Sequence, residues 1–524
     1  MTIPLSFGSP VSFLNFDQLP ILIVCFLSII IGSAALNYNR KSDLPHANPP
    51  STFGLRITKQ NEFYKDGMDI ITSAKKRFAG KPYKMLTTLG EVLVLPPKYG
   101  GIIHNNPALN FRKAVTTDFP PHVSGFEPFA FVDRPDEMLQ NMVKKHLTKL
   151  LNTVTAPLSE EATFAVDHVL GSSPDWQTAS LSKAISSIVA RLSSRVFLGE
   201  EICRNEEWLK TTTQYATHAF MVGVESSTIP SLLRPIVSRF SQRGKTVRAE
   251  VQRAREIIAP VIAKRRAMKE QARINNEPIP QFNDALEWAE MEFNGKPYDP
   301  SALQLFLSFA AIHTTTDLAC ETMLRLANDP SQITALREEM IDVLSKEGWK
   351  KTSLYNLKLL DSAIKEAQRV RPTNKINSVQ LRRLVVKDVV LEGGVKIRKG
   401  ERAQVDMSPM WDPSVYPNPD TYDMYRFLRM REQSGGAQKA QLVTTSPDFL
   451  PFGHGTNACP GRFFASNEIK LALCHLLLKY DWRLAPGTTT EPLISGQFMT
   501  VNPKSKLQYR RRKEEIDLES LDFH

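Results

Sequence analysis

One cysteine among glycines constrains this chain more than any other feature. It lies in the segment Pro451–Arg462, which reads PFGHGTNACPGR. An apolar-periodic run from Phe463 to Leu478 follows the segment and predicts a helix. Because proline favours the first helical position, we expect Cys459 at or near the N-cap of that helix. The unpaired N–H groups and the dipole at a helix start would favour a thiolate over a thiol.

The glycines beside this cysteine suggest what the thiolate binds. Gly453, Gly455 and Gly461 let the backbone pass close to a wide, flat group. A buried thiolate in a tight loop of this kind is how a protein offers haem iron an axial sulfur. The alternative is a buried structural cysteine, which is what most free cysteines are.

The spacing Phe452-x-x-Gly455-x-x-x-Cys459-x-Gly461 resembles the haem-binding signature of the cytochrome P-450 superfamily, the haem-thiolate monooxygenases. The resemblance implies haem b as cofactor, with Cys459 as axial ligand and Phe452 packed beside it to tune the iron. The family usually has Arg or His two residues before the cysteine, in contact with a haem propionate. Here that position holds Asn457, which can donate a hydrogen bond but carries no charge.

Length and composition favour one large domain. The 524 residues alone suggest about three domains, but no internal repeat or long Gly/Ser linker divides the chain. A net charge of +11 suggests acidic partners such as anionic lipid, nucleic acid or an acidic protein face. Zinc-finger spacing, an RNP pattern and basic-aromatic interleaving are all missing from the sequence, so nucleic acid is not supported. The five cysteines lack paired spacing, which fits a reducing compartment.

An uncharged apolar run, Leu19 to Leu36, predicts a membrane anchor. At helical rise it covers roughly 27 Å, enough for a bilayer core. A cleaved signal peptide is the alternative, with Ser33-Ala34-Ala35 as a passable cleavage site. Residues 1–18 hold no Lys or Arg, whereas Arg40 and Lys41 follow the run. We therefore favour a single span that leaves the C-terminal bulk of the chain in the cytosol.

The expected organisation follows from this anchor. It comprises a short tail (1–18), the anchor (19–36), a Pro-rich hinge (37–54), the catalytic domain (55–509) and a charged tail (510–524). A proline-rich hinge after one anchor helix is also what microsomal members of the family show, which implies the endoplasmic reticulum membrane. We expect the charged stretch Arg510–Glu515 to be disordered.

A second motif lies in a predicted long helix. Asp299-Pro300 supplies an N-cap and a first-turn proline, and the helical pattern runs to Asn328-Asp329-Pro330. The middle of this helix, AAIHTTTD, resembles the family's oxygen-binding helix. The resemblance implies that Thr314 hydrogen-bonds dioxygen and relays protons, and it places His313 where the family usually has an acid. A histidine can relay protons near neutral pH, but a core helix whose His and Thr only satisfy hydrogen bonds is the alternative.

A third motif comes from a predicted helix, Leu357 to Arg371. Glu366 and Arg369 lie three residues apart on one face and could form a surface ion pair of little energy. In the family this Glu-x-x-Arg pair joins a later arginine, here Arg426 before Phe427, to lock the haem loop. The resemblance therefore implies a buried structural triad.

Two basic residues are further cofactor candidates by resemblance. Lys144, in the predicted helix Met138 to Leu151, takes the place of the family arginine that holds a propionate, although a solvated helix face is the alternative. Arg382, in QLRR, is a candidate for another propionate contact. The segment Arg195–Gly199 with the nearby Cys203 and Trp208 resembles filamentous-fungal members of terpenoid metabolism, such as ent-kaurene oxidase-like enzymes.

Together these motifs predict a mainly helical P-450 fold with a small β-rich part, preceded by one transmembrane helix. The implied function is insertion of one oxygen atom from O2 into an apolar substrate of terpenoid or meroterpenoid type. The implied partners are an NADPH-cytochrome P-450 reductase, with cytochrome b5 as a further candidate. Two other functions stay open: a haem-thiolate isomerase or dehydratase that needs no O2, and a membrane-anchored haem sensor without turnover.

Overall fold

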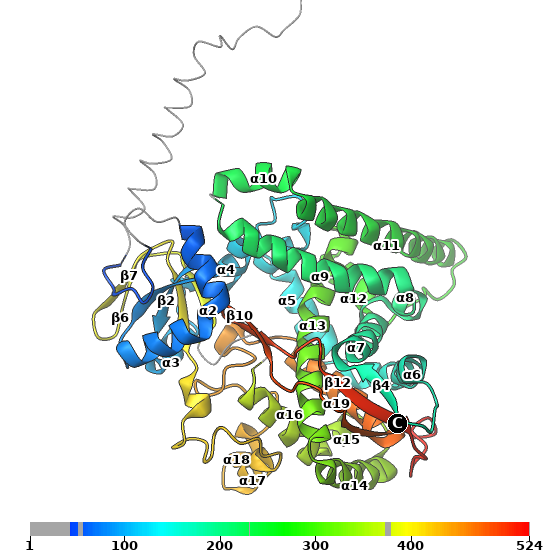
Figure 1. The fold of residues 1–524 in the computed structure, drawn as a ribbon. Helices are drawn as coiled ribbons and strands as arrows, with labels where there is room; N and C mark the ends of the chain where they lie inside the picture. Colours follow the sequence, from blue (N-terminus) through cyan, green and yellow to red (C-terminus); the bar gives the residue numbers. More distant parts are fainter. Residues whose placement is uncertain (1–41, 51–55, 230, 373–378, 523–524) are drawn as a thin grey trace, which may run out of the picture.

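A central helix, α13, passes through a large helical part of the molecule, and a smaller β-rich part lies to one side (Figure 1). The computed structural model describes residues 42–50, 56–229, 231–372 and 379–522 of the chain. The helices are α2 (Arg56–Arg77), α3 (Gly100–Ile103), α4 (Phe111–Asp118), α5 (Met138–Met142), α6 (Leu151–Leu170), α7 (Leu181–Leu198), α8 (Glu200–Cys203), α9 (Glu206–Ser227), α10 (Arg234–Phe240), α11 (Gln242–Ile274), α12 (Ala285–Phe293), α13 (Pro300–Ala327), α14 (Pro330–Glu347), α15 (Lys351–Asn356), α16 (Lys358–Val370), α17 (Arg426–Glu432), α18 (Gly436–Lys439) and α19 (Arg462–Lys479). The expectation of a mainly helical fold with a small β-rich part is confirmed.

The strands form small sheets. They are β1 (Tyr83–Thr87), β2 (Gly90–Leu95), β3 (Leu109–Asn110), β4 (Gln177–Ser180), β5 (Val379–Val385), β6 (Val389–Leu391), β7 (Val395–Ile397), β8 (Arg402–Asp406), β9 (Tyr480–Leu484), β10 (Leu493–Ser495), β11 (Phe498–Thr500) and β12 (Lys506–Arg511). The largest sheet has the order β1-β2-β8-β5-β3, and β2 and β8 pair in parallel. A second sheet has the order β4-β12-β9, so the last strand of the chain lies between two earlier ones.

Helix α13 begins and ends where its caps predict. The Asp299 side chain accepts hydrogen bonds from the N–H groups of Ser301 and Ala302, which satisfies two of the donors left free at a helix start. Most of its side chains are buried because the helix packs against α7, α9, α11 and α16. Helix α16 likewise lies within the predicted range Leu357 to Arg371. The predicted helix Met138 to Leu151 is instead divided, because α5 is followed by a π-helical turn, Val143–Thr148, before α6 begins.

The two ends of the described chain both pack on the fold. Residues 42–50, in the predicted hinge, run beside β1, where the Ala47 N–H donates to Lys84 O at 2.8 Å. The predicted disorder of the charged stretch Arg510–Glu515 is wrong. Arg511 is the last residue of β12, and Arg512 donates to Leu478 O at 3.0 Å. Alternating burial along β12 stabilises this strand, and the basic side chains pair with acids beside it, as Arg510 does with Asp481.

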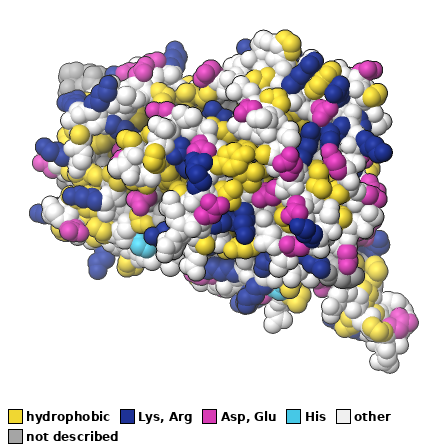
Figure 2. Space-filling view, turned by 90° about the horizontal axis from the view of Figure 1, so that it is seen from below, with side chains coloured by type: hydrophobic (Ala, Val, Ile, Leu, Met, Phe, Trp, Pro, Cys, Tyr) yellow, Lys and Arg dark blue, Asp and Glu magenta, His cyan; other side chains and the backbone are white. Residues whose placement is uncertain are grey.

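The surface mixes both signs of charge. Figure 2 shows Lys and Arg side chains spread among Asp and Glu over one face, with hydrophobic side chains between them. Among the described residues, no helix combines the length and apolar character needed to cross a bilayer, and the predicted anchor 19–36 lies outside them.

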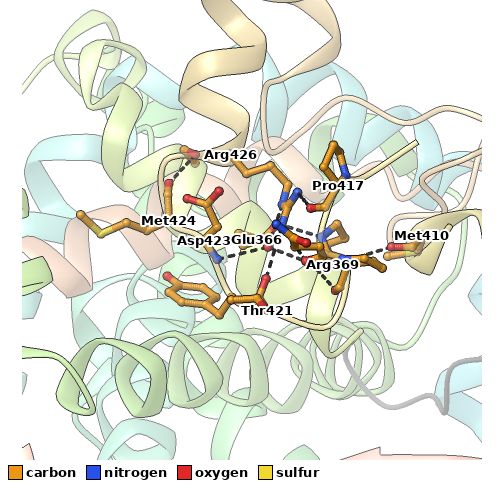
Figure 3. A network of polar contacts seen from close by, with 12 residues as sticks. Glu366, Arg369, Met410, Pro417, Thr421, Asp423, Met424 and Arg426 are labelled. Carbon is orange, nitrogen blue, oxygen red and sulfur yellow. Dashed lines mark hydrogen bonds and ion pairs between the residues drawn. The ribbon is translucent and has the colours of Figure 1, made fainter. Parts of the chain in front are cut away.

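The buried side of α16 carries charged residues that meet chain segments far away in sequence. Arg369 donates from Nε and Nη2 to the two oxygens of Glu366, both at 2.8 Å, and Arg426 Nε donates to Glu366 Oε1 at 3.0 Å (Figure 3). Glu366 and Arg369 are fully buried. Both arginines also donate to backbone carbonyls, for example Arg369 to Met410 O and Arg426 to Pro417 O. The three residues therefore form one buried triad that holds the segment between β8 and α17.

A second buried carboxylate, Asp361, extends this anchoring towards the cysteine loop. It pairs with Arg431 of α17 at 2.7 Å and with Lys470 of α19 at 2.6 Å, and it accepts the Leu442 N–H at 2.9 Å. Burial alone would raise the pKa of Asp361, but Lys470 and Arg431 hold it below its usual range. Through Asp361 and Glu366, α16 positions the chain that leads to Cys459.

A buried glutamate, Glu468, links α19 to the core helices. Ser193 of α7 donates to Glu468 Oε1 at 2.6 Å, and Thr315 of α13 also hydrogen-bonds this carboxyl group. Burial raises the pKa of Glu468 to about 8, although both hydrogen bonds oppose the shift. Glu468 thus joins the helix after the cysteine loop to the helix that carries Thr314.

Glu366→Ala should lower the free energy of unfolding by about 3–5 kcal/mol, because it leaves two buried arginines without their carboxylate, whereas Arg426→Ala should cost less because Glu366 keeps Arg369. The matched control is Asp342→Ala, which breaks an exposed pair with Lys346 and should cost about 0.5 kcal/mol or less. Denaturant unfolding of the purified proteins measures both. If the triad variants unfolded at the same midpoint as Asp342→Ala, the triad would not stabilise the fold.

Stability should fall as the pH rises from about 4.5 to 8, in a component that Glu468→Gln removes. A folded-state pKa above the unfolded value means that the folded chain keeps a proton which the unfolded chain releases. The stabilisation is complete below the unfolded pKa and is lost as the pH rises through the folded pKa. Unfolding midpoints at pH 5.5, 7 and 8.5 should show Glu468→Gln gaining on the wild type with pH. The exposed Glu200→Gln serves as control, and parallel profiles for all three proteins would contradict the assignment.

Candidate active site

The cysteine loop is closed by its own backbone. The Cys459 N–H donates to Phe452 O at 2.7 Å, and the Ala458 N–H donates to Gly455 O at 3.0 Å. Helix α19 starts at Arg462 with Gly461 as N-cap, so Cys459 lies two residues before the cap. The prediction that Cys459 lies at or near the N-cap is met, but Pro460 precedes the helix instead of occupying its first turn.

Two of the predicted glycines have distinct surroundings. Gly455 has a φ of +73°, and a Cβ there would lie 2.2 Å from His104 Cδ2 and 2.4 Å from Asn105 Oδ1. The end of α3 can therefore approach the loop only because residue 455 has no side chain. A Cβ on Gly461 would meet no atom within 4 Å. The loop is thus packed on its Gly455 side and open at Gly461.

The residues after α3 hold the outer side of the loop. Asn105 Oδ1 accepts the Thr456 N–H at 2.8 Å, and the rings of His104 and His454 lie 4.8 Å apart. Asn457 uses its amide locally, donating to Thr456 Oγ1 at 3.4 Å.

Cys459 is one of the described cysteines that form no disulfide. Desolvation raises the pKa of its thiol, while the N–H groups of Gly461 and Arg462 and the charge of Arg462 lower it in part. The N–H groups at the helix start do favour the thiolate, as expected, but desolvation outweighs them in the protein alone. A bound metal cation would reverse the balance, since a coordinating thiol is deprotonated outright. The donors at Gly461 and Arg462 are placed to stabilise the sulfur in that state.

Arg462, which the sequence did not single out, supports the loop directly. Its Nη1 donates to Cys459 O at 2.8 Å and its Nε donates to Val443 O at 3.0 Å. Its guanidinium carbon also lies 4.6 Å from the centre of the Phe463 ring. The side chain thus joins the cysteine backbone to the segment before the loop. An arginine directly after Pro-Gly was the only signal in the sequence.

Thr314 lies on the one part of α13 that is not covered. Its Oγ1 donates to Ala310 O at 2.9 Å, and both Thr314 and Ala310 are exposed, whereas most of the helix is buried. The neighbouring Thr315 is buried and reaches Glu468 in α19, which places this turn of α13 close to the helix that follows Cys459. The hydroxyl of Thr314 is therefore free to accept a hydrogen bond from a small molecule beside α13.

His313 points elsewhere. Its Nε2 lies 3.1 Å from Thr213 O on α9, and burial lowers its pKa from the ordinary value, although the hydrogen bond to Thr213 and the charge of Asp317 oppose the shift. The sequence predicted an acid–base group at this position. In the structure, the His313 ring instead hydrogen-bonds a backbone carbonyl.

The two candidate propionate contacts differ from expectation. Arg382 donates to Asp118 Oδ2 at 2.6 Å, so its charge is already paired inside the protein. Lys144 is exposed in the π-helical turn, and its charge acts on Glu137. That turn does reach the cysteine loop, because Thr148 Oγ1 donates to Pro460 O at 3.4 Å.

The neighbouring arginine, Arg383, is the residue that the sequence reasoning missed. It is 2% exposed, its Nη2 donates to His104 O at 3.2 Å, and no acid pairs with it among the described residues. Its Nε has no hydrogen-bond partner in the described part of the chain, and burial lowers its pKa to about 10. A buried cation without a counter-ion is costly, so its position beside His104 fits an anionic group bound at the cysteine loop.

These observations fit the haem that the cysteine motif predicts. Cys459 offers a sulfur ligand with backbone N–H donors, Gly461 leaves its side of the loop open, and Arg383 supplies a cation for a carboxylate. Thr314 and Ala310 leave an accessible strip on the central helix.

Comparison with known proteins also identifies a haem-binding family. The family model for Cytochrome P450 matches residues 136–511. The chain is similar to cytochrome P450 monooxygenase eqxH of Fusarium heterosporum, with 41% identity over 93% of this chain and 94% of that protein. It is also similar to cytochrome P450 monooxygenase hepE of Aspergillus oryzae, with 42% identity over 93% of this chain and 90% of that protein.

Among solved structures, the fold is similar to that of retinoic acid-bound cyanobacterial CYP120A1. The TM-score is 0.65 and the identity 18%, over 90% of this chain and 100% of that chain, which is a likeness of fold. The family model covers most of the chain, and the fungal relatives match it over nearly its whole length. This chain is therefore a member of the cytochrome P450 family of monooxygenases.

Proposed function

We propose that this cytochrome P450 is a membrane-anchored monooxygenase of fungal secondary metabolism that oxidises an apolar terpenoid or meroterpenoid intermediate. Membership in the family implies a haem cofactor. The observation that carries the proposal is the pairing of an open cysteine loop with an exposed threonine on an otherwise buried helix. The fungal relatives support the secondary-metabolic setting.

The chain's residues have separate parts in such a reaction. Haem held through Cys459 would supply the activation of O2, of which one atom enters a C–H bond or an alkene and the other leaves as water with two electrons and two protons. The N–H groups of Gly461 and Arg462 stabilise the sulfur, and Arg383 holds a carboxylate of the cofactor. Because the Thr314 O–H is donated to Ala310 O, its Oγ1 lone pairs can accept a hydrogen bond from the open side. When it turns away from Ala310, the hydroxyl can instead donate a hydrogen bond on that side.

Aromatic side chains beside α13 support an apolar substrate. Phe129 stacks on Phe119 with ring centres 4.5 Å apart, and it meets Phe309 of α13 edge-on at 4.9 Å. Phe306 joins the same group at 5.8 Å from Phe129. Phe309 directly precedes the exposed Ala310, and Phe306 and Phe309 are half-buried, whereas Phe119 and Phe129 are buried behind them. Apolar side chains therefore adjoin the exposed part of α13. An apolar lining with a few polar groups is typical of sites for small apolar ligands.

We also propose that electrons come from NADPH through a reductase, with cytochrome b5 as a second candidate donor. The net charge of +11 supports an acidic partner. Leu19–Leu36, followed by Arg40 and Lys41, supports a single-span anchor in the endoplasmic reticulum with the catalytic domain in the cytosol. Protease treatment of intact microsomes should digest the chain beyond residue 55, and protection of that part would overturn this topology.

Arg383→Leu should weaken haem retention roughly tenfold or more, because a buried charge-assisted hydrogen bond to a carboxylate is lost. Arg383→Lys should recover part of it. In the haem-free protein, Arg383→Leu should be neutral or stabilising, since it removes a buried cation without a counter-ion. The rate of haem transfer to apomyoglobin measures retention. Arg382→Leu is the matched comparison, and a larger loss there would restore the sequence prediction of Arg382 as the contact.

The activity is tested by comparing metabolites of a host with and without this chain, and then in reductase-containing microsomes. We expect an oxygenated product that requires both NADPH and O2, and no product from Cys459→Ala. Thr314→Ala should keep haem but form more peroxide per NADPH, because a lost proton relay costs roughly 10²–10⁴-fold when it limits the rate. Product without NADPH or O2 would favour an isomerase or dehydratase. Haem binding with no product under any condition would favour a sensor.

A further inference from the structure

His313 makes a contact that a proton relay does not need. Its Nε2 lies 3.1 Å from Thr213 O, a backbone carbonyl in the middle of α9. Because a carbonyl oxygen only accepts, Nε2 must carry the hydrogen and donate it. In the neutral ring, which burial favours, Nδ1 is then the acceptor nitrogen. The hydrogen bond therefore specifies the Nε2–H tautomer, which a backbone carbonyl cannot deprotonate.

Burial favours the neutral form of His313, and the charge of Asp317 opposes this in part. Burial lowers its pKa, and the charged group that acts on it is Asp317, one turn further along α13. The Asp317 carboxylate already has other partners, because Arg371 pairs with it at 2.9 Å and the Val501 N–H donates to it at 2.8 Å. On α9, Tyr215 donates to Gly125 O at 3.0 Å, and His218 bonds Glu250 of α11 at 2.6 Å.

Helix α9 matters because it covers the aromatic group beside α13. In Figure 1, α9 and α11 cross the upper part of α13. Tyr215 donates to Gly125 O at 3.0 Å, and the Phe220 ring meets Phe498 edge-on at 4.9 Å. A Cβ on Gly223 would lie 2.5 Å from a Phe119 ring atom, so α9 rests directly on that ring. The position of α9 thus determines the shape of the apolar surface next to Thr314.

We propose that His313 is a positioning residue, which ties α9 to α13 at the turn carrying Thr314 and so sets the space open to the substrate. It acts through α9 and not by moving protons. The inference rests on membership in the monooxygenase family and is independent of the proposed substrate, reductase and anchor.

The test uses the full-length, haem-loaded protein and three substitutions. His313→Gln keeps an N–H donor at a similar reach but cannot act as an imidazole acid or base. His313→Leu keeps the volume and removes the donor. Thr314→Ala, one residue away, is the matched control that leaves the tether in place. If His313→Leu fails to fold, the smaller His313→Ala replaces it.

Amide hydrogen exchange is the decisive measurement because it needs no substrate. We expect the amides of residues 211–219 to exchange roughly two- to tenfold faster in His313→Leu, as for the loss of one hydrogen bond. His313→Gln should restore protection, and Thr314→Ala should match the wild type in this segment. Unchanged exchange in a folded His313→Leu protein would overturn the proposal.

Turnover in reductase-containing microsomes distinguishes the tether from a relay. We expect His313→Gln to keep the wild-type pH profile of NADPH oxidation and a low peroxide yield, whereas Thr314→Ala raises peroxide. If His313→Gln kept α9 protected but behaved like Thr314→Ala, with a changed pH profile, His313 would be a proton relay and the proposal would be wrong. The hydrogen-exchange results can be interpreted even if no product is found. Failure of the proposed function can therefore be distinguished from failure of the His313 proposal.

Discussion

The rest of this structure depends on the charges buried on α16. Glu366 binds two arginines, one from its own helix and one from the start of α17, and Asp361 binds α17 and α19 together. Neither carboxylate could stay charged in the interior without these partners, because desolvation penalises an isolated charge heavily. The partners are available only when the segments between β8 and α19 lie in one arrangement. Satisfying the buried charges therefore selects the path of the chain into the cysteine loop.

The loop itself is held from several sides by backbone contacts and not by a core of its own. Residue 105 bonds it from the end of α3, Thr148 from the π-helical turn, and Arg462 from the start of α19. Backbone polar groups held in place by different elements move little relative to one another. That arrangement holds the loop around Cys459 in a defined position. Space remains beside Gly461, where a large planar cofactor could approach.

Two positions at the site, the adjacent pair Arg382 and Arg383 and the single His313, could be only partly predicted from the sequence. The resemblance pointed to Arg382 in QLRR, because the sequence alone does not show which of the two adjacent arginines is paired with an acid. The structure pairs Arg382 with Asp118, 264 residues earlier, and leaves Arg383 buried without an acid among the described residues. His313 is similar, because its place in the motif suggested acid–base chemistry, whereas its partner is a carbonyl on another helix. In both cases the deciding partner is remote in sequence.

The sequence by itself determined the features that depend on neighbours within a few residues. These are the span of α13 between Asp299 and Asn328, the helix after the cysteine loop, and the chemistry of the loop around Cys459. Capping, glycine conformations and helical periodicity are local, so their signals survive in a single sequence. Only the tertiary structure decided that Arg510 and Arg511 end strand β12, that Arg512 packs beside it, and that Arg383 lacks an acid among the described residues. Strand pairing and charge neutralisation require groups brought together by folding, and no local pattern records which groups those are.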